Sequence, residues 1–242
     1  MGSIDINNMN KLYQYSTISA FMQGVCKGGK ETWQVLSRGD HGLGTVSGLT
    51  GEIMIIDGDA YQFSSEQTRK LEDSDALPFA MTTYFRPVWE TFVPHVTSDS
   101  LSRRLIEFLS PRQNCFVSIR LDGFFEHITF RIIAAQEKDH ETPLELIQRQ
   151  KMSDHVGIRG TIFGFRTPRF ASAFSPAGYH LHFISEDRTL GGHVLNFHAS
   201  SATISASAID EYNVELPQSP GFNGFPIDPP KEEEVKTVEG TL

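Results

Sequence analysis

Apolar residues recur along the first half of the chain in two spacings, and each spacing predicts a different kind of element. Between Leu12 and Cys26 the spacing is roughly helical, which predicts an amphipathic helix. Shorter helices are predicted at residues 31–40 and 98–110, the second with a Ser and Asp start and with Pro111 after it. Short apolar runs bounded by glycine predict strands in the remainder.

Two hairpins, one before and one after the helix at 98–110, and a glycine-rich turn are also predicted. The runs 52–57 and 60–63 flank Gly58, and the runs 115–120 and 124–133 flank an Asp-Gly pair, which favours a tight turn. The glycine-rich stretch from residue 41 to 51 lacks the Gly-Lys-Ser/Thr ending of a phosphate loop, and a strand-like run follows it. We therefore interpret it as a tight strand-turn-strand.

The second half contains four further strand-like runs after Gly160. A polar, charged stretch at residues 137–157 predicts the joint between two sheet-bearing halves. The predicted fold class is α/β (α+β), with two lobes that are each built on a mixed or mostly antiparallel sheet with few helices. Five prolines between Pro217 and Pro230 argue against regular structure there, and composition alone favours a disordered tail.

We divide the chain accordingly. Residues 1–11 form a frayed N-terminus, 12–140 an N-terminal lobe, 141–216 a C-terminal lobe with a histidine hairpin, and 217–242 an extended Pro-rich tail.

Composition and charge exclude several classes of function. Lys and Arg number 21 against 30 Asp and Glu, so the formal net charge is −9, and no basic stripe is present to bind nucleic acid or an anionic membrane. No run approaches the ~18 apolar residues of a membrane-spanning helix. The first twenty residues lack a signal-peptide pattern, and Cys26 and Cys115 form no CxxC pair, so we expect a reduced, cytoplasmic setting.

Three of the nine histidines predict a metal site. His180 and His182 lie two apart in a strand-like run, so their side chains project from one face. A tight turn at Asp187 and Arg188 would place His182 opposite His193, and the three imidazoles would converge. Three neutral ligands leave one coordination position open, which is typical of catalytic zinc sites. The alternative, surface histidines on an exposed strand face, stays open, and His198 is predicted to point away.

Glu52 and Arg131 are charged residues within apolar strand-like runs. Such a residue lies either on an exposed face or in a paired cleft. The sequence pattern alone does not place either residue near the histidines.

Three segments together make the sequence recognisable: GDHGLGTVSGLTGEIMIIDG, RGTIFGFRTP and GYHLHFISEDRTLGGHV. They closely resemble the α-acetolactate decarboxylase family, above all in GYHLHFI followed by GGHV. The resemblance implies conversion of 2-acetolactate to acetoin and carbon dioxide, with Zn²⁺ or another divalent metal bound by His180, His182 and His193. It also implies a homodimer.

The resemblance transfers further roles to single residues. Glu52 corresponds to the family's cleft glutamate, Thr45 to its substrate-binding threonine and Arg131 to its substrate-binding arginine, with Arg120 as a competing position. The family's tail folds back over the metal and contributes a second glutamate, here Glu239, with residues 232–234 competing. This reverses the prediction of a disordered tail. His41 stands where the family often has Phe.

The implied chemistry is decarboxylation of a β-keto acid, in which the metal polarises the ketone and stabilises the enediolate. Two alternatives come from other classes. One is another three-histidine metalloenzyme, such as a metal-dependent dioxygenase. The other is a non-catalytic relative on the same fold.

Overall fold

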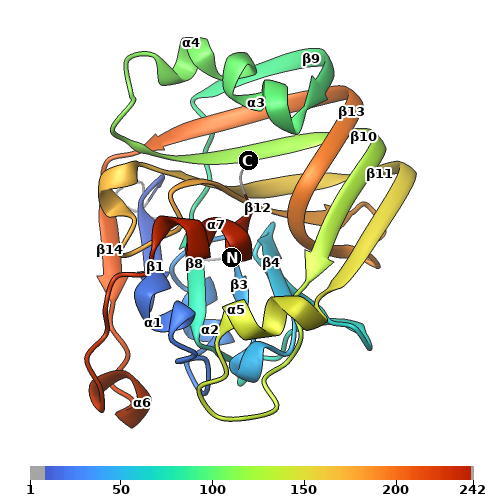
Figure 1. The fold of residues 1–242 in the computed structure, drawn as a ribbon. Coiled ribbons are helices and arrows are strands. Elements are labelled where there is room, and N and C mark those ends of the chain that lie inside the picture. Colours follow the sequence, from blue (N-terminus) through green and yellow to red (C-terminus); the bar gives the residue numbers. More distant parts are fainter. Residues whose placement is uncertain (1–8, 241–242) are drawn as a thin grey trace.

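Two large β-sheets face each other in the computed structural model, which describes residues 9–240 (Figure 1). One has seven strands in the order β14-β1-β8-β3-β4-β5-β6, and the other has five in the order β10-β11-β12-β13-β9. Neighbouring strands are antiparallel except for the parallel pair β1 and β14. The predicted class, an α+β protein with few helices, is confirmed.

The central strands of the seven-stranded sheet are buried. Its members are β1 (Leu12–Tyr15), β3 (His41–Thr45), β4 (Glu52–Ile56), β5 (Asp59–Phe63), β6 (Thr68–Lys70), β8 (Phe79–Thr83) and β14 (Tyr212–Glu215). Every residue of β3, β4 and β8 is buried, so these central strands are covered on both faces. The pairing of β3 with β4 and of β4 with β5 confirms both predicted turns in this region.

The five-stranded sheet is curved and faces the seven-stranded sheet (Figure 1). It contains β9 (Trp89–Thr97), β10 (Phe116–Ile132), β11 (Lys151–Thr167), β12 (Gly178–Ser185) and β13 (Gly191–Ile209). β10 pairs with both β11 and β13, so the long strands curve round instead of forming a flat layer. A large apolar cluster, including Phe63 and Phe163, fills the space between the two sheets.

The predicted hairpin around Asp122 and Gly123 is wrong, because both residues lie inside the single long strand β10. Asp122 pairs with Thr161 on one side and Thr203 on the other, so ladder bonds to two neighbours override the local turn preference. Gly123 is needed there for another reason. A Cβ at this position would lie 2.7 Å from the carbonyl oxygen of Ser201 on β13.

The predicted first helix is also partly wrong. Residues 12–15 form β1 between β8 and β14, and the helix α1 covers Ile18–Met22 only, capped by the Thr17 side chain. The aromatic residues of β1 favour a strand once two partners are available. The helix at 31–40 is confirmed as α2 (Thr32–Leu36), and that at 98–110 as α3 (Ser98–Arg104) and α4 (Ile106–Leu109).

Sheet membership does not follow the predicted division near residue 140. β9 and β10 come from the first half but pair in the five-stranded sheet, whereas β14 comes from the second half and pairs with β1. The predicted joint holds a short helix, α5 (Pro143–Leu146), and the first residues of β11. The domain bounds themselves stay a prediction.

The tail packs back onto the folded chain. After a one-turn helix α6 (Pro220–Asn223), the helix α7 (Glu232–Glu239) crosses the front of the molecule in the view of Figure 1, and its Val235 and Val238 join the apolar cluster. The expectation that prolines exclude regular structure fails at α6, where Pro220 occupies the first turn, a position that tolerates proline. Val235, Val238 and Glu239 of α7 are buried, so this helix belongs to the packed structure.

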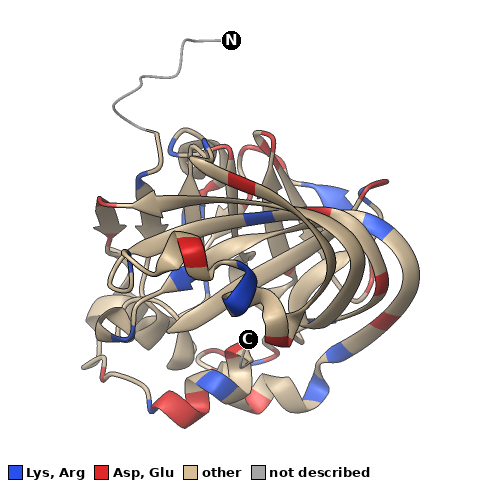
Figure 2. Ribbon diagram, turned by 90° about the horizontal axis from the view of Figure 1, so that it is seen from above, with Lys and Arg blue, Asp and Glu red and all other residues tan. Residues whose placement is uncertain are grey.

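Charge is spread over the described part of the molecule. Figure 2 shows Lys and Arg scattered among Asp and Glu along the ribbon. None of the helices that the structure describes is both long enough and apolar enough to cross a membrane.

Candidate metal and catalytic site

The three predicted histidines converge. His180 and His182 project from β12, and His182 pairs directly with His193 of β13, as predicted from a tight turn between the two strands. Their ring centroids lie 5.1 to 5.3 Å apart, and each offers one ligand atom within 4.8 Å of the other two. All three residues are at most 5% exposed. His198 lies outside this group and faces Glu126, with 3.3 Å between Nδ1 and Oε2.

Backbone carbonyls orient two of the three rings. Nδ1 of His182 lies 2.7 Å from the carbonyl oxygen of Ile53, and Nε2 of His193 lies 2.7 Å from that of Glu239. Because a carbonyl only accepts, each of these nitrogens donates, and the other nitrogen of the ring keeps its lone pair. Nε2 of His182 and Nδ1 of His180 have no hydrogen-bond partner within the described residues. This donor set fits a divalent cation.

Burial keeps the three imidazoles neutral. Burial, together with the positive charge of Arg131, lowers the pKa of His180 to about 3. The pKa values of His182 and His193 are also well below 6.5, chiefly through burial. Neutral histidines can bind a metal without first losing a proton.

The two facing sheets each contribute a row of side chains. On the seven-stranded sheet, Phe79, Thr45 and Glu52 lie side by side across β8, β3 and β4. On the five-stranded sheet, Arg131 pairs with His193, which pairs with His182. The rows meet where Oε2 of Glu52 lies 3.7 Å from Nε2 of His182. Packing of the sheets thus joins residues that the sequence pattern alone left apart.

Arg131, Glu52 and Glu239 surround the histidines. Nη1 of Arg131 lies 3.8 Å from Oε1 of Glu52, and Nη2 donates to the carbonyl of Val238 in α7. Oε2 of Glu239 lies 3.2 Å from Nε2 of His180 and 3.8 Å from Nδ1 of His193. The competing residues lie elsewhere, since Arg120 joins a different network and residues 232–234 form the first turn of α7.

Both glutamates have a raised pKa. Burial, together with the neighbouring Glu239, raises the pKa of Glu52 from 4.5 to about 7 against the opposing effect of Arg131. Burial likewise raises the pKa of Glu239 to about 7, again opposed by Arg131. Carboxyls that titrate near neutral pH can both give and take a proton, as general acid and base catalysis requires.

The pocket between the rows has an apolar side that sequence reasoning did not single out. Phe21 of α1, Phe79 of β8, Ile133 and Val238 line it together with the polar residues. Phe21 was predicted on a helix, but nothing in the sequence indicated that its ring would face the histidines. The predicted Thr45 also lines the pocket, and its hydroxyl donates to the carbonyl of Gly51 at 2.8 Å.

A fourth buried histidine, His41, lies in a different environment. Nδ1 of His41 lies 2.8 Å from Oδ1 of Asp40, and its Nε2 lies 2.8 Å from Nη1 of Arg120. Asp40 also accepts from Arg86, and Arg120 donates to Asp57 and Asp122. We call this group the His41 network: Asp40, His41, Asp57, Arg86, Arg120 and Asp122.

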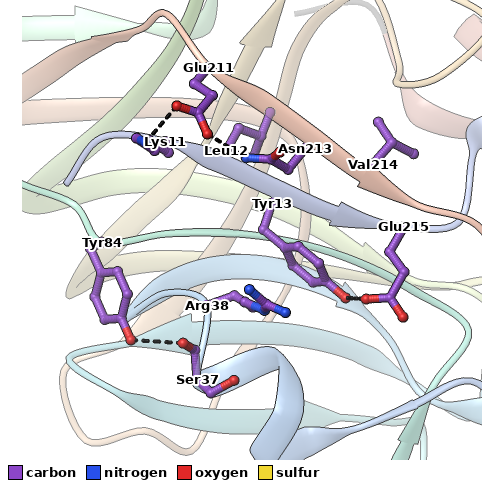
Figure 3. Close-up of a pocket in the computed structure, with 10 residues that line it drawn as sticks. All are labelled: Lys11, Leu12, Tyr13, Ser37, Arg38, Tyr84, Glu211, Asn213, Val214 and Glu215. Carbon is purple, nitrogen blue, oxygen red and sulfur yellow. Dashed lines mark hydrogen bonds and ion pairs between the residues drawn. The ribbon is translucent and has the colours of Figure 1, made fainter. Parts of the chain in front are cut away.

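A larger pocket, of about 410 Å³, lies at the edge of the seven-stranded sheet (Figure 3). In it Glu211 pairs with Lys11, the Tyr13 hydroxyl donates to Glu215, and the Tyr84 hydroxyl donates to the carbonyl of Ser37. None of the predicted site residues lines it. Pocket size therefore does not identify the candidate site here, whereas the convergence of ligand nitrogens and carboxyls does.

Comparison with known proteins gives consistent results. The family model described as alpha-acetolactate decarboxylase matches residues 12–229, a range that stops before Glu239. An alpha-acetolactate decarboxylase of Brevibacillus brevis is 36% identical over 88% of this chain and 75% of its own length. That of Bacillus subtilis strain 168 is 32% identical over 96% of this chain and 92% of its own length. The crystal structure of the Bacillus subtilis enzyme superimposes with a TM-score of 0.91, covering 96% of this chain and all of that one.

Proposed function

The chain belongs to the α-acetolactate decarboxylase family, and from this premise we propose that it decarboxylates 2-acetolactate to acetoin. The observation that carries the proposal is the meeting of three neutral histidines, two carboxyls and one guanidinium in a single buried pocket. This set matches what the reaction needs, namely a binding site for a metal ion, a binding group for a carboxylate, and proton donors.

We propose that His180, His182 and His193 hold the metal ion, Zn²⁺ or another divalent cation. The two unpartnered nitrogens and the carbonyl partners of His182 and His193 support this assignment. When bound there, a divalent cation acts as a Lewis acid that polarises the ketone of the substrate and stabilises negative charge on its oxygen.

Arg131 is proposed to bind the negatively charged substrate. Its guanidinium is 3% exposed, and Nε has no hydrogen-bond partner within the described residues, so donor capacity remains for a ligand. Charge-assisted hydrogen bonds would fix which carbon–carbon bond aligns with the ketone. Thr45 is proposed to accept a hydrogen bond from the substrate hydroxyl, because its own proton is engaged by Gly51.

Glu52 and Glu239 are proposed to move the proton. Cleavage of the bond to the carboxylate releases CO₂ and leaves its electron pair on the adjoining carbon, shared with the ketone oxygen as an enediolate. One proton delivered to carbon then gives acetoin, so the balance is acetolactate anion plus one proton to acetoin plus CO₂. Carboxyls with a pKa of about 7 can supply that proton and recover it from water.

Substrate entry requires a wall of the pocket to move. The free space among the lining side chains is about 20 Å³, close to the volume that one water molecule needs. We propose α7 as the moving wall, because Val238 and Glu239 of this helix close the pocket.

A direct assay tests the proposal. Purified protein is supplied with racemic 2-acetolactate, and acetoin is measured before and after chelation, with metal content determined by elemental analysis. We expect acetoin formation that disappears with the metal and returns when Zn²⁺ is restored. Full activity in verified metal-free protein would overturn the metal proposal, and oxygen-dependent turnover with bound iron would favour a dioxygenase instead.

Two finer expectations remain proposals. We propose a homodimer, which sedimentation analysis of the purified protein tests, and a cytoplasmic setting, which fractionation of cells tests. The structure records Cys26 and Cys115 as free thiols, which suits a reducing compartment.

A further inference from the structure

We propose that Phe21 and Phe79 form an apolar wall that limits the size of the alkyl groups on the substrate. The inference rests on the proposed function and goes beyond it. It assigns the site to 2-hydroxy-3-oxo acids with short alkyl substituents and names the side chains that exclude longer ones.

The wall lies directly beside the polar groups. Phe79 is the cross-strand neighbour of Thr45, which is in turn the neighbour of Glu52, so one row of the sheet passes from apolar to polar within three strands. Phe21 reaches the same pocket from α1, and its ring centroid lies 5.7 Å from that of Phe79. Both rings belong to the apolar cluster between the sheets.

The substrate, like the pocket, has polar groups on one side and apolar groups on the other. Acetolactate carries a carboxylate, a hydroxyl and a ketone, and also two methyl groups. The histidines, Arg131 and the glutamates match the three oxygen-bearing groups by charge and hydrogen bonding. The methyl groups, which gain from leaving water, are left for the apolar side.

The wall has little room to retreat. A Cβ added at Gly44 of β3 would lie 2.4 Å from the carbonyl oxygen of Phe79, which shows how closely β3 and β8 pack. α1 is fixed at its start, where the backbone N–H of Ile18 donates to Phe174 and the hydroxyl of Ser19 donates to Ala173. When α7 closes over a bound substrate, each added methylene must therefore displace an anchored aromatic side chain.

The experiment measures kcat/KM for homologues in which the substituent on the hydroxyl-bearing carbon is methyl, ethyl or propyl. In the unmodified protein we expect kcat/KM to fall about 10-fold or more for each added methylene, because one methylene in an apolar pocket typically changes kcat/KM by about that factor. Phe21→Leu and Phe79→Leu should each raise the ethyl-to-methyl ratio of kcat/KM by about 10-fold.

Phe116→Leu is the matched control. Phe116 belongs to the same apolar cluster but does not line the pocket, and it packs against Tyr212 instead. This variant should lose stability in thermal unfolding and keep the ethyl-to-methyl ratio, which separates a specificity role from a structural one.

The outcomes separate the inference from the function on which it rests. If the protein makes no acetoin from acetolactate, the proposed function itself is wrong. If the protein makes acetoin but kcat/KM is the same for the methyl, ethyl and propyl homologues, the proposed function stands and the apolar wall is wrong. Leucine variants that lower kcat/KM equally for all three homologues also overturn it. A flat series in the unmodified protein overturns the wall even where a variant fails to fold.

Discussion

Two groups of histidines, acids and arginines join the same pair of sheets, one buried and one partly exposed, and they differ in what their polar atoms contact. The site cluster consists of Glu52, Arg131, His180, His182, His193 and Glu239. The His41 network links β3 to β10 through the contact between His41 and Arg120. Residue types are nearly the same in both groups, so composition does not separate a candidate active site from a structural joint.

The difference lies in hydrogen-bond partners. In the network, Asp40 accepts from His41, from Arg86 and from the backbone of Phe85, and these bonds hold its pKa below 3.8 although burial acts to raise it. In the site cluster, Glu52 and Glu239 have a pKa of about 7, and ring nitrogens of His180 and His182 lack partners within the described residues. Unsatisfied buried groups that converge on one pocket thus mark the functional candidate.

The largest effect is expected from His182→Ala. The substitution removes the ring whose Nε2 is unpartnered and whose Nδ1 is oriented by Ile53. We expect loss of bound metal and a fall in acetoin formation of at least about 100-fold, because loss of a ligand exceeds the loss caused by its supporting partners. Elemental analysis and the acetoin assay check this. A variant with full metal content and activity would break the distinction between the two groups.

The matched control is His41→Phe, in the other group. Arg120 and Asp40 would each lose one hydrogen-bond partner, which is expected to lower the free energy of unfolding by about 1–3 kcal/mol. The ring would still pack between Phe85 and Phe163. Metal content and turnover should be retained, and denaturant unfolding measures the loss of stability.

Glu52→Gln should have the next largest effect. The amide keeps the shape of the side chain but cannot transfer a proton, so we expect kcat to fall by about 10² to 10⁴-fold while the metal stays bound. Asp57→Asn is the control in the His41 network, where the carboxylate faces Arg120 and Arg188 at the surface. It should leave kcat unchanged. Equal kcat values for Glu52→Gln and unmodified protein would remove Glu52 from the proposed chemistry.

The sequence predicted the histidine group because the information is local. Side chains alternate along a strand, and the tight turn at Asp187 and Arg188 sets which residues of β12 and β13 pair. Arg188 has a φ of +64°, consistent with that turn. The same local reasoning failed at Asp122 and Gly123, because pairing with two neighbouring strands outweighed the turn preference.

The rest of the site depends on contacts that no local pattern encodes. Glu52 and Arg131 come together because two different sheets face each other, and Phe21 joins them from a helix. Glu239 was identified through family resemblance, since composition favoured a disordered tail, and α7 instead packs Val235 and Val238 into the molecule. The apolar wall was missed because a phenylalanine in the core looks the same in sequence whether or not it borders a pocket.

Titration should change stability without changing the fold or the metal ligands, and its effect has opposite signs in the two groups. In metal-free protein the folded pKa of Glu239 is raised, so its contribution to stability is present below its unfolded pKa of about 4.5 and is lost as the pH rises to about 7. The folded pKa of Asp40 is lowered, so its contribution is present above about 3.8 and is lost as the pH falls below that value.

Amide variants measure these two contributions separately. Between pH 4.5 and 7, the stability of the unmodified protein relative to Glu239→Gln should decrease by up to about 1.4 kcal/mol per pH unit, the slope for one proton. Relative to Asp40→Asn it should stay constant over that range. Urea unfolding of the chelated proteins at several pH values provides the free energies. If the stability relative to each variant changed with pH in the same way, the pKa values of Glu239 and Asp40 would not be shifted in opposite directions. The contrast between the site cluster and the His41 network would then be wrong.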